Sequence, residues 1–127
     1  MNERDTPPDR LIDASGLVAA LRQFATERDW DRFHSPKNLV MALTGEVGEL
    51  SEVFQWMSAE ASCEAARDPA TATAVRHELA DVLLYAVRLA DVLGVDLNAA
   101  AAEKLRLNAE KYPVRAARGS SKKYTEL

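Results

Sequence analysis

The chain has 127 residues and a net charge of −4, with 47% hydrophobic and 28% charged residues. Such values are typical of one globular domain with a small core. An acidic chain is a poor match for proteins that hold nucleic-acid polymers by bulk charge, whereas a small anionic substrate remains compatible if a metal ion offsets the repulsion.

The N-terminal residues and the hydropathy pattern predict a cytoplasmic protein without a membrane segment. Residues 1–10 are polar and lack the apolar region of a signal peptide, and Pro7 and Pro8 favour a flexible leader. No apolar run reaches the ~18 residues of a membrane span. The single cysteine, Cys63, excludes an intrachain disulfide and favours a reducing compartment.

Helical periodicity predicts four helices in chain order. Ser35 and Pro36 form an N-cap and first turn for the second helix, Gly94 ends the third, Asp96 caps the fourth, and Pro113 stops it. The expected helices cover residues 11 to about 29, 36 to about 57, about 70 to 93, and 97 to about 111.

The fold class that follows is all-α, because β-alternation and internal repeats are both missing from the pattern. We expect the four helices to pack in a bundle-like core. The predicted organisation is a leader at 1–10, an all-α domain at 11–112 and a basic tail at 113–127.

The second predicted helix carries acids on its apolar face, in the stretch GEVGELSE. At about 100° per residue, Glu46 lies within about 40° of Leu39 and Leu50, and Glu49 lies about 60° to one side. Glu52 falls about 120° away, at the margin of the stripe. Glu46 and Glu49 therefore belong to the face that should pack inward.

The third predicted helix repeats this arrangement in the stretch RHELADVLLYAV. Glu78 and Asp81 lie three residues apart within an apolar stripe that includes Val82 and Tyr85. Packing of the two stripes against each other would bring Glu46, Glu49, Glu78 and Asp81 together.

Four converging carboxylates need compensation, because removing each charge from water costs several kcal/mol. Either some of the acids are protonated or cations bind, and all-oxygen ligands suit Mg²⁺ and Mn²⁺. A di-iron site is disfavoured because it uses Glu-x-x-His motifs, whereas His77 directly precedes Glu78 and points elsewhere. A solvated E-x-x-E pair on a helix face remains the alternative for each motif alone.

The pair of motifs, E-x-x-E followed by E-x-x-D on the next helix, resembles the signature of the all-α MazG-like nucleoside triphosphate pyrophosphohydrolases. The resemblance covers about residues 17–127 and is closest to the dCTP pyrophosphatase branch. The segments that carry it are ERDWDRFHSPKNLVMALTGEVGELSEVFQW, RHELADVLLYAV, GVDLNAAAAEKLRLNAEKYPV and RGSSKKYTEL.

The resemblance implies a magnesium-dependent hydrolase, with Mn²⁺ as a possible substitute, that cuts a nucleoside triphosphate between its α- and β-phosphates. It also implies a homotetramer or homodimer. Glu46, Glu49, Glu78 and Asp81 would be the metal ligands and catalytic residues, and Glu49 is the candidate base.

The resemblance also assigns the substrate contacts. Phosphate contacts fall to Lys104, Asn108 and Lys111, which share one face of the fourth helix; a solvated basic face is the alternative. The nucleobase pocket would be lined by aromatic and imidazole side chains, namely Trp30, His34, Trp56 and Tyr85.

Several alternatives stay open within this interpretation. Trp56 is equally compatible with core packing, and His34 with a loop hydrogen bond. Dedicated dCTP enzymes of the family carry a histidine where this chain has Leu21, which leaves the base preference open. The tail residues Arg118 and Lys122 are compatible with a solvated segment or with one that orders over the site.

The function expected is hydrolysis of dCTP, including 5-modified forms, for sanitation of the nucleotide pool. The alternatives are a broad-specificity or dUTP pyrophosphohydrolase and a non-catalytic helical oligomerisation module. No nucleic-acid polymer is expected as a partner.

Overall fold

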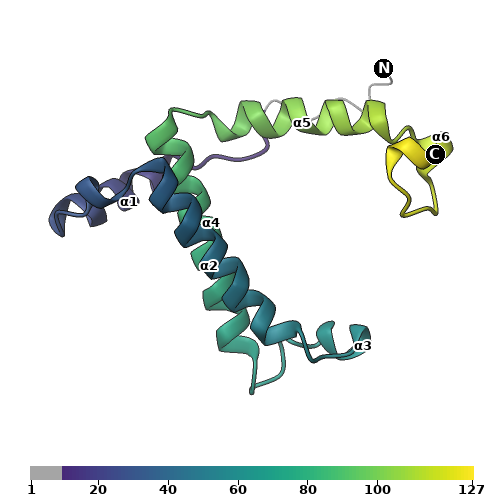
Figure 1. The fold of residues 1–127 in the computed structure, drawn as a ribbon, viewed down its shortest axis with the longest axis horizontal. Coiled ribbons are helices and arrows are strands. Elements are labelled where there is room, and N and C mark those ends of the chain that lie inside the picture. The colour runs from purple at the N-terminus through teal and green to yellow at the C-terminus, as the bar shows by residue number, and fades with distance from the viewer. Residues whose placement is uncertain (1–9) are drawn as a thin grey trace. The chain divides into compact units, whose positions relative to one another are not determined.

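The computed structural model describes residues 10–127 and contains, over these residues, helices and no strand (Figure 1). The predicted all-α class is confirmed, and the rest of the predicted leader lies outside the described residues. Within the described part, none of the helices is both long and apolar enough to cross a membrane. The four long helices are α1 (Ser15–Glu27), α2 (Pro36–Phe54), α4 (Ala72–Leu93) and α5 (Leu97–Lys111).

The chain forms two compact units. The central unit, Ala14–Val95, contains α1, α2, α4 and the short helix α3 (Ala59–Ser62). The terminal unit joins residues 10–13 to 96–127, which include α5 and the short helix α6 (Val114–Ala117).

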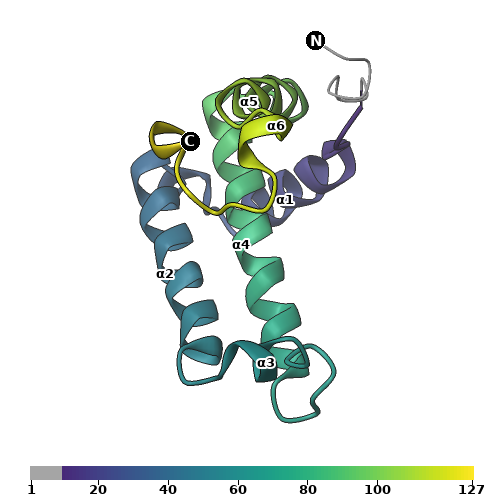
Figure 2. The ribbon, with the colours of Figure 1, turned by 90° about the vertical axis from the view of Figure 1, so that its right-hand side faces the viewer.

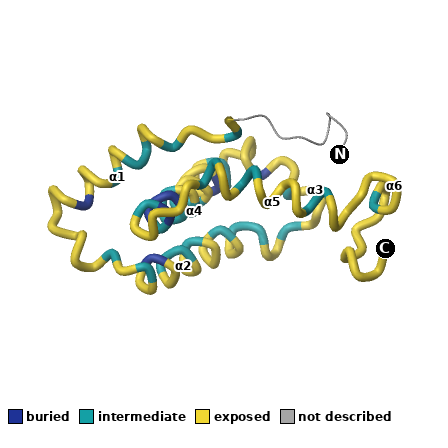
Figure 3. The backbone as a smooth tube through the Cα atoms, turned by 90° about the horizontal axis from the view of Figure 1, so that it is seen from above, coloured by how far each residue is buried: buried dark blue, intermediate teal, exposed yellow. Residues whose placement is uncertain are grey.

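The core of the central unit lies where α2 and α4 run side by side in opposite directions (Figure 2). Leu39 on α2 and Val87 on α4 are each 1% exposed, and α1 packs on α4 through the buried Ala25. The buried residues of these three helices appear dark blue in Figure 3. The inward faces of α2 and α4 are the apolar stripes that carry the acids.

Capping residues set most of the helix ends where the sequence predicted them. The Ser35 hydroxyl accepts a hydrogen bond from the Asn38 N–H, and Asp96 caps α5 in the same way. Gly94 ends α4 with a left-handed φ of 70°. The start of α1 is four residues later than expected, and α2 ends three residues earlier. The short helices α3 and α6 form where a loop and a tail were predicted.

The terminal unit ties the chain before α1 to the start of α5. The Asn98 Oδ1 accepts hydrogen bonds from the N–H groups of Leu11 and Ile12, at 2.7 and 3.1 Å. At the other end of α5, the rings of Tyr112 and Tyr124 meet edge to face with centroids 6.0 Å apart. The predicted tail is therefore folded back onto the end of α5.

The turn after α1 places Asp29 in the left-handed region, with φ 55°. Its N–H donates to the Thr26 carbonyl and the next N–H, of Trp30, donates to the Ala25 carbonyl, so the helix closes with a Schellman motif. Because glycine adopts this conformation without a Cβ clash, we expect Asp29→Gly to raise the free energy of unfolding by up to about 1 kcal/mol. Urea unfolding followed by circular dichroism measures the change.

The matched control is Gly94→Ala, at the equivalent position of α4. A Cβ at Gly94 meets no atom within 4 Å, so its cost comes from the backbone alone. We expect this substitution to lower the free energy of unfolding by about 1 kcal/mol or more. A destabilised Asp29→Gly protein would contradict the assignment of strain to this turn.

Candidate active site

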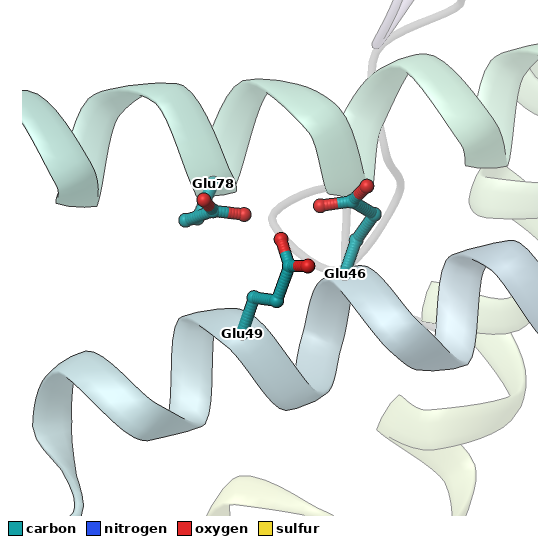
Figure 4. Close-up of side chains that lie close together, drawn as sticks. All are labelled: Glu46, Glu49 and Glu78. Carbon is teal, nitrogen blue, oxygen red and sulfur yellow. The ribbon is translucent and has the colours of Figure 1, made fainter.

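Three of the predicted acidic residues meet between α2 and α4. Glu46 and Glu49 extend from α2 towards α4, and Glu78 extends from α4 towards them (Figure 4). One oxygen from each carboxylate lies within 4.8 Å of the others. We call these three residues the carboxylate cluster.

The helical positions of the acids explain this convergence. Leu39, buried on α2, lies seven residues before Glu46, and Val75, buried on α4, lies three residues before Glu78. Residues at these spacings share a helix face, so the apolar contacts that pair the helices also turn the acids inward. The structure thus brings together three of the four acids that the sequence placed on the two apolar stripes.

Burial and neighbouring carboxyls raise the pKa values of two members of the cluster, Glu46 and Glu78. Glu46 is partly buried, and desolvation, followed by the neighbouring carboxyls of Glu78 and Glu49, raises its pKa to about 7. The pKa of Glu78 is raised as well, first by hydrogen bonding to the Glu49 carboxyl and then by burial. Glu46 and Glu78 therefore bind protons more tightly than isolated glutamates do.

Two oxygen atoms of the cluster fit a cation ligand role. Glu46 Oε2 and Glu78 Oε2 are buried, and neither has a hydrogen-bond partner among the described residues. A buried carboxylate oxygen without a donor is costly unless a proton or a cation satisfies it. An all-oxygen donor set on two helices suits a hard divalent ion, so these residues can hold one.

Asp81, the fourth predicted ligand, lies beside the cluster without joining the group of three. Its charge raises the pKa of both Glu46 and Glu78, which places it close to them. It also lines a cavity of about 190 Å³. Asp81 therefore belongs to the cavity and lies three residues, one helical turn, after Glu78 of the carboxylate cluster.

One wall of the cavity is a single face of α4. Asp81, Leu84, Tyr85 and Arg88 line it, at helical spacings of three and four. The face changes along the helix from a carboxylate, through apolar and aromatic groups, to a guanidinium. This wall therefore includes one acidic and one basic residue, with apolar and aromatic groups between them.

The opposite wall comes from α1 and from the turn that follows it. Leu21 and Phe24 lie on α1, and Trp30 and His34 flank the 3₁₀ turn Asp31–Phe33. The Trp30 ring meets Phe24 edge to face at 5.6 Å, and its centroid lies 6.3 Å from that of His34. Predicted pocket residues Trp30, His34 and Tyr85 are therefore together in one cavity.

A charge network lies behind this wall. Arg88, 8% exposed, donates from Nη2 to Asp31 at 2.8 Å, from Nη1 to Asp91 at 3.4 Å and from Nε to His34 Nδ1 at 3.1 Å. Arg22 of α1 donates to the same Asp91, at 2.8 Å from its Nε. This hydrogen bond, partly offset by burial, lowers the pKa of Asp91. The network joins the turn to both α1 and α4.

Phe24 and Arg88 are cavity residues that sequence reasoning missed. Phe24 lies within the first predicted helix and was not assigned to a site. Arg88 lies seven residues after Asp81 and three after Tyr85, so the same helical arithmetic places it on the cavity face. The presence of a basic residue on the apolar stripe of the third predicted helix could have identified Arg88 as a cavity residue.

The remaining predicted substrate residues lie elsewhere in the chain. Trp56 follows α2, is 89% exposed and is not among the cavity residues of the described structure. Lys104, Asn108 and Lys111 lie on α5, in the terminal unit, where the Lys111 ammonium lies 5.0 Å from the Tyr124 ring centroid. Their roles stay predictions.

Comparison with known proteins identifies relatives along nearly the whole chain. dCTP pyrophosphatase 1 of Mus musculus is 47% identical over 124 residues, which cover 98% of this chain and 71% of that protein. dCTP pyrophosphatase 1 of Homo sapiens is 49% identical over 122 residues, covering 96% of this chain and 70% of its own.

A solved structure and a family model agree with these relatives. A pyrophosphatase from Archaeoglobus fulgidus matches with a TM-score of 0.71 and 37% identity, over 77% of this chain and 90% of its own. The model of the MazG-like family matches residues 42–127, which include every member of the carboxylate cluster. The chain therefore belongs to the MazG-like family.

Proposed function

We propose that this protein is a hydrolase that cleaves dCTP, and 5-modified dCTP, to the monophosphate and pyrophosphate, and thereby sanitises the nucleotide pool. The observation that carries the proposal is the position of Asp81, which lines an aromatic cavity and lies one helical turn after Glu78 of the carboxylate cluster. Relatives named dCTP pyrophosphatase 1 support the choice of substrate. Such a substrate suits a cytoplasmic location.

The carboxylate cluster and the cavity are proposed to bind different parts of the substrate. The triphosphate belongs at the cluster, where a divalent ion offsets the charge of phosphate and carboxylate alike. The base belongs in the cavity, where Trp30 and Tyr85 offer aromatic surface. Stacking of a base on such a ring contributes about 1–3 kcal/mol.

The reaction adds water across one phosphoanhydride bond. Water attacks the α-phosphorus, the bond to the oxygen bridging the α- and β-phosphates breaks, and pyrophosphate leaves. We assign Glu49 as the base that accepts the water proton, since it is the exposed member of the cluster. A Mg²⁺ ion, or Mn²⁺ in its place, held by Glu46, Glu49, Glu78 and Asp81 would supply charge neutralisation and polarise the α-phosphorus.

Further phosphate and base contacts are proposed from the family resemblance. Lys104, Asn108 and Lys111 share one face of α5 and offer two cations and an amide to the phosphates. Trp56 is proposed to contact the base.

The proposal is tested by pyrophosphate release from a panel of dCTP, 5-methyl-dCTP, dUTP, dTTP, purine dNTPs and ribonucleotides, each with Mg²⁺ or Mn²⁺ and with EDTA. We expect the two cytosine deoxynucleotides to give the highest kcat/KM and EDTA to stop the reaction. Equal rates on all substrates would replace the proposal with a broad-specificity pyrophosphohydrolase. No release from any substrate would favour the helical oligomerisation module.

We also propose that the chain assembles as a homotetramer or homodimer. Large apolar side chains are exposed on both helices of the core, including Met41 of α2 at 64% and Leu79 and Leu83 of α4 at 57% and 49%. Large apolar side chains left exposed on paired helices are compatible with a subunit interface. Light scattering measures the mass in solution, and a monomer would refute the assembly.

A further inference from the structure

Arg88 occupies an unusual position for an arginine, because its side chain is 9% exposed and lines the cavity. Its three guanidinium nitrogens each have a partner: Asp31 for Nη2, Asp91 for Nη1 and His34 for Nε. Two carboxylates balance its charge, so the guanidinium is held in place from both the turn and α4. The contact with His34 is the one with a chemical consequence for the cavity.

The hydrogen bond from Arg88 determines which nitrogen of His34 carries the proton. A guanidinium N–H only donates, so His34 Nδ1 accepts and the proton of the neutral ring lies on Nε2. Desolvation, followed by the positive charge of Arg88, lowers the pKa of His34, and the ring is therefore neutral near pH 7. With Nδ1 occupied, the Nε2–H is the polar group that His34 can offer to a ligand in the cavity.

The rest of the cavity leaves this donor with few competitors. Leu21, Phe24 and Leu84 are apolar, and the Trp30 indole N–H also only donates. Tyr85 alone among the aromatic residues there can either donate or accept. Asp81 is the acceptor of this lining and is assigned to the proposed cation, so the fixed donors left for a base are His34 Nε2–H and the Trp30 N–H.

We propose that Arg88 is a positioning residue that makes His34 a fixed hydrogen-bond donor, and that this donor selects a pyrimidine with an unprotonated ring nitrogen, N3 of cytosine, over the N3–H of uracil or thymine. The inference rests on the proposed function, since it takes the cavity as the base site. In this chain Leu21 stands where dedicated dCTP enzymes of the family carry a histidine. The His34 Nε2–H would be the group that distinguishes cytosine from uracil and thymine.

Cytosine is preferred over uracil because two hydrogen-bond donors that face each other cannot pair. Cytosine N3 accepts a hydrogen bond from Nε2–H, whereas uracil presents N3–H and leaves both donors unpaired in a partly buried site. One lost or unsatisfied hydrogen bond changes kcat/KM by about 10-fold to 100-fold. The opposite tautomer of His34 would reverse the preference.

The first test compares kcat/KM for dCTP and dUTP in the full-length protein and in Arg88→Met. We expect the dCTP:dUTP ratio to fall by about 10-fold or more in Arg88→Met, and Arg88→Lys to restore part of it because a lysine still donates. The matched control is Arg22→Met, which removes the other arginine on Asp91 but has no contact with His34. It should keep the ratio of the unsubstituted protein.

Two further measurements do not depend on the folding of Arg88→Met. In the unsubstituted protein, ¹⁵N NMR should find His34 protonated on Nε2 and unprotonated on Nδ1. His34→Gln can accept from Arg88 and still donate into the cavity, whereas the shorter His34→Asn cannot reach as far, so only His34→Gln should keep the base preference.

The outcomes separate this inference from the proposed function. Failure to hydrolyse any triphosphate overturns the proposed function and the base assignment together. Hydrolysis of dCTP with an unchanged ratio in folded Arg88→Met, equal ratios in the two His34 variants, or a proton on Nδ1 overturns the inference alone.

Discussion

Glu49→Gln should reduce kcat for pyrophosphate release from dCTP by at least about 100-fold, because the substitution removes both a cation ligand and the proposed base. The glutamine keeps the size of the side chain, and Glu49 is exposed, so the fold should be unaffected. A coupled pyrophosphate assay at saturating Mg²⁺ measures the loss, and calorimetry of Mg²⁺ binding measures the ligand role separately.

The matched control is Glu52→Gln, which removes the same charge from the same helix three residues further on. Glu52 is exposed and lies outside the carboxylate cluster, so its substitution should change kcat by no more than about twofold. Equal losses in the two variants would point to the overall charge of α2 instead of the cluster. Full turnover by Glu49→Gln would remove Glu49 from the mechanism.

The raised pKa of Glu46 should make the free energy of unfolding depend on pH. Without divalent metal, the protein should become less stable as pH rises from about 4.5 to about 7, because the folded state keeps a proton on Glu46, whose pKa is raised from 4.5 to about 7. This contribution is fully present below 4.5 and is lost above 7. The lowered pKa values of His34 and Asp91 have the opposite sign. The contribution of Asp91 acts below its ordinary value of 3.8, outside this window. The contribution of His34 acts below 6.5, inside the window, so the share of Glu46 is measured as the difference from Glu46→Gln.

Thermal unfolding in EDTA across this pH range measures the effect. Glu46→Gln carries no ionisable group and should flatten the dependence, apart from the share due to Glu78. Added Mg²⁺ should reverse the slope, since the ion binds the ionised carboxylates and competes with protons. An equal pH dependence of the midpoint in metal-free Glu46→Gln and in the unsubstituted protein would contradict the burial of the Glu46 carboxyl.

The sequence predicted the long helices well because their ends carry side-chain signals. Ser35, Gly94 and Asp96 each act within one turn of the chain, so their effect is local and readable. Helix α3 has four residues, too few for apolar periodicity to register, and it was interpreted as a loop. The start of α1 was placed too early because the N–H groups of Leu11 and Ile12 donate to Asn98, far along the chain.

Site residues could be predicted from the sequence only where the spacing of residues within a single helix determines which face they occupy. Glu46, Glu49 and Glu78 follow from the rotation of α2 and α4, and the apolar packing of those helices does the rest. The cavity needs α1 packed against α4, a contact that no local spacing reports, and so Phe24 was not recognised. Arg88 escaped notice because a basic residue in a helix is usually solvated.

The exposed leucines of α4 have a consequence for how the molecule behaves on dilution. Under the proposed assembly, apolar surface such as that of Leu79 and Leu83 is buried only when chains associate. The free energy of association therefore adds to the free energy of unfolding of each chain. The unfolding midpoint then varies with protein concentration through mass action. The helix pair that carries the carboxylate cluster would be held together partly by its neighbours, and the activity of each chain would depend on how many of them are present.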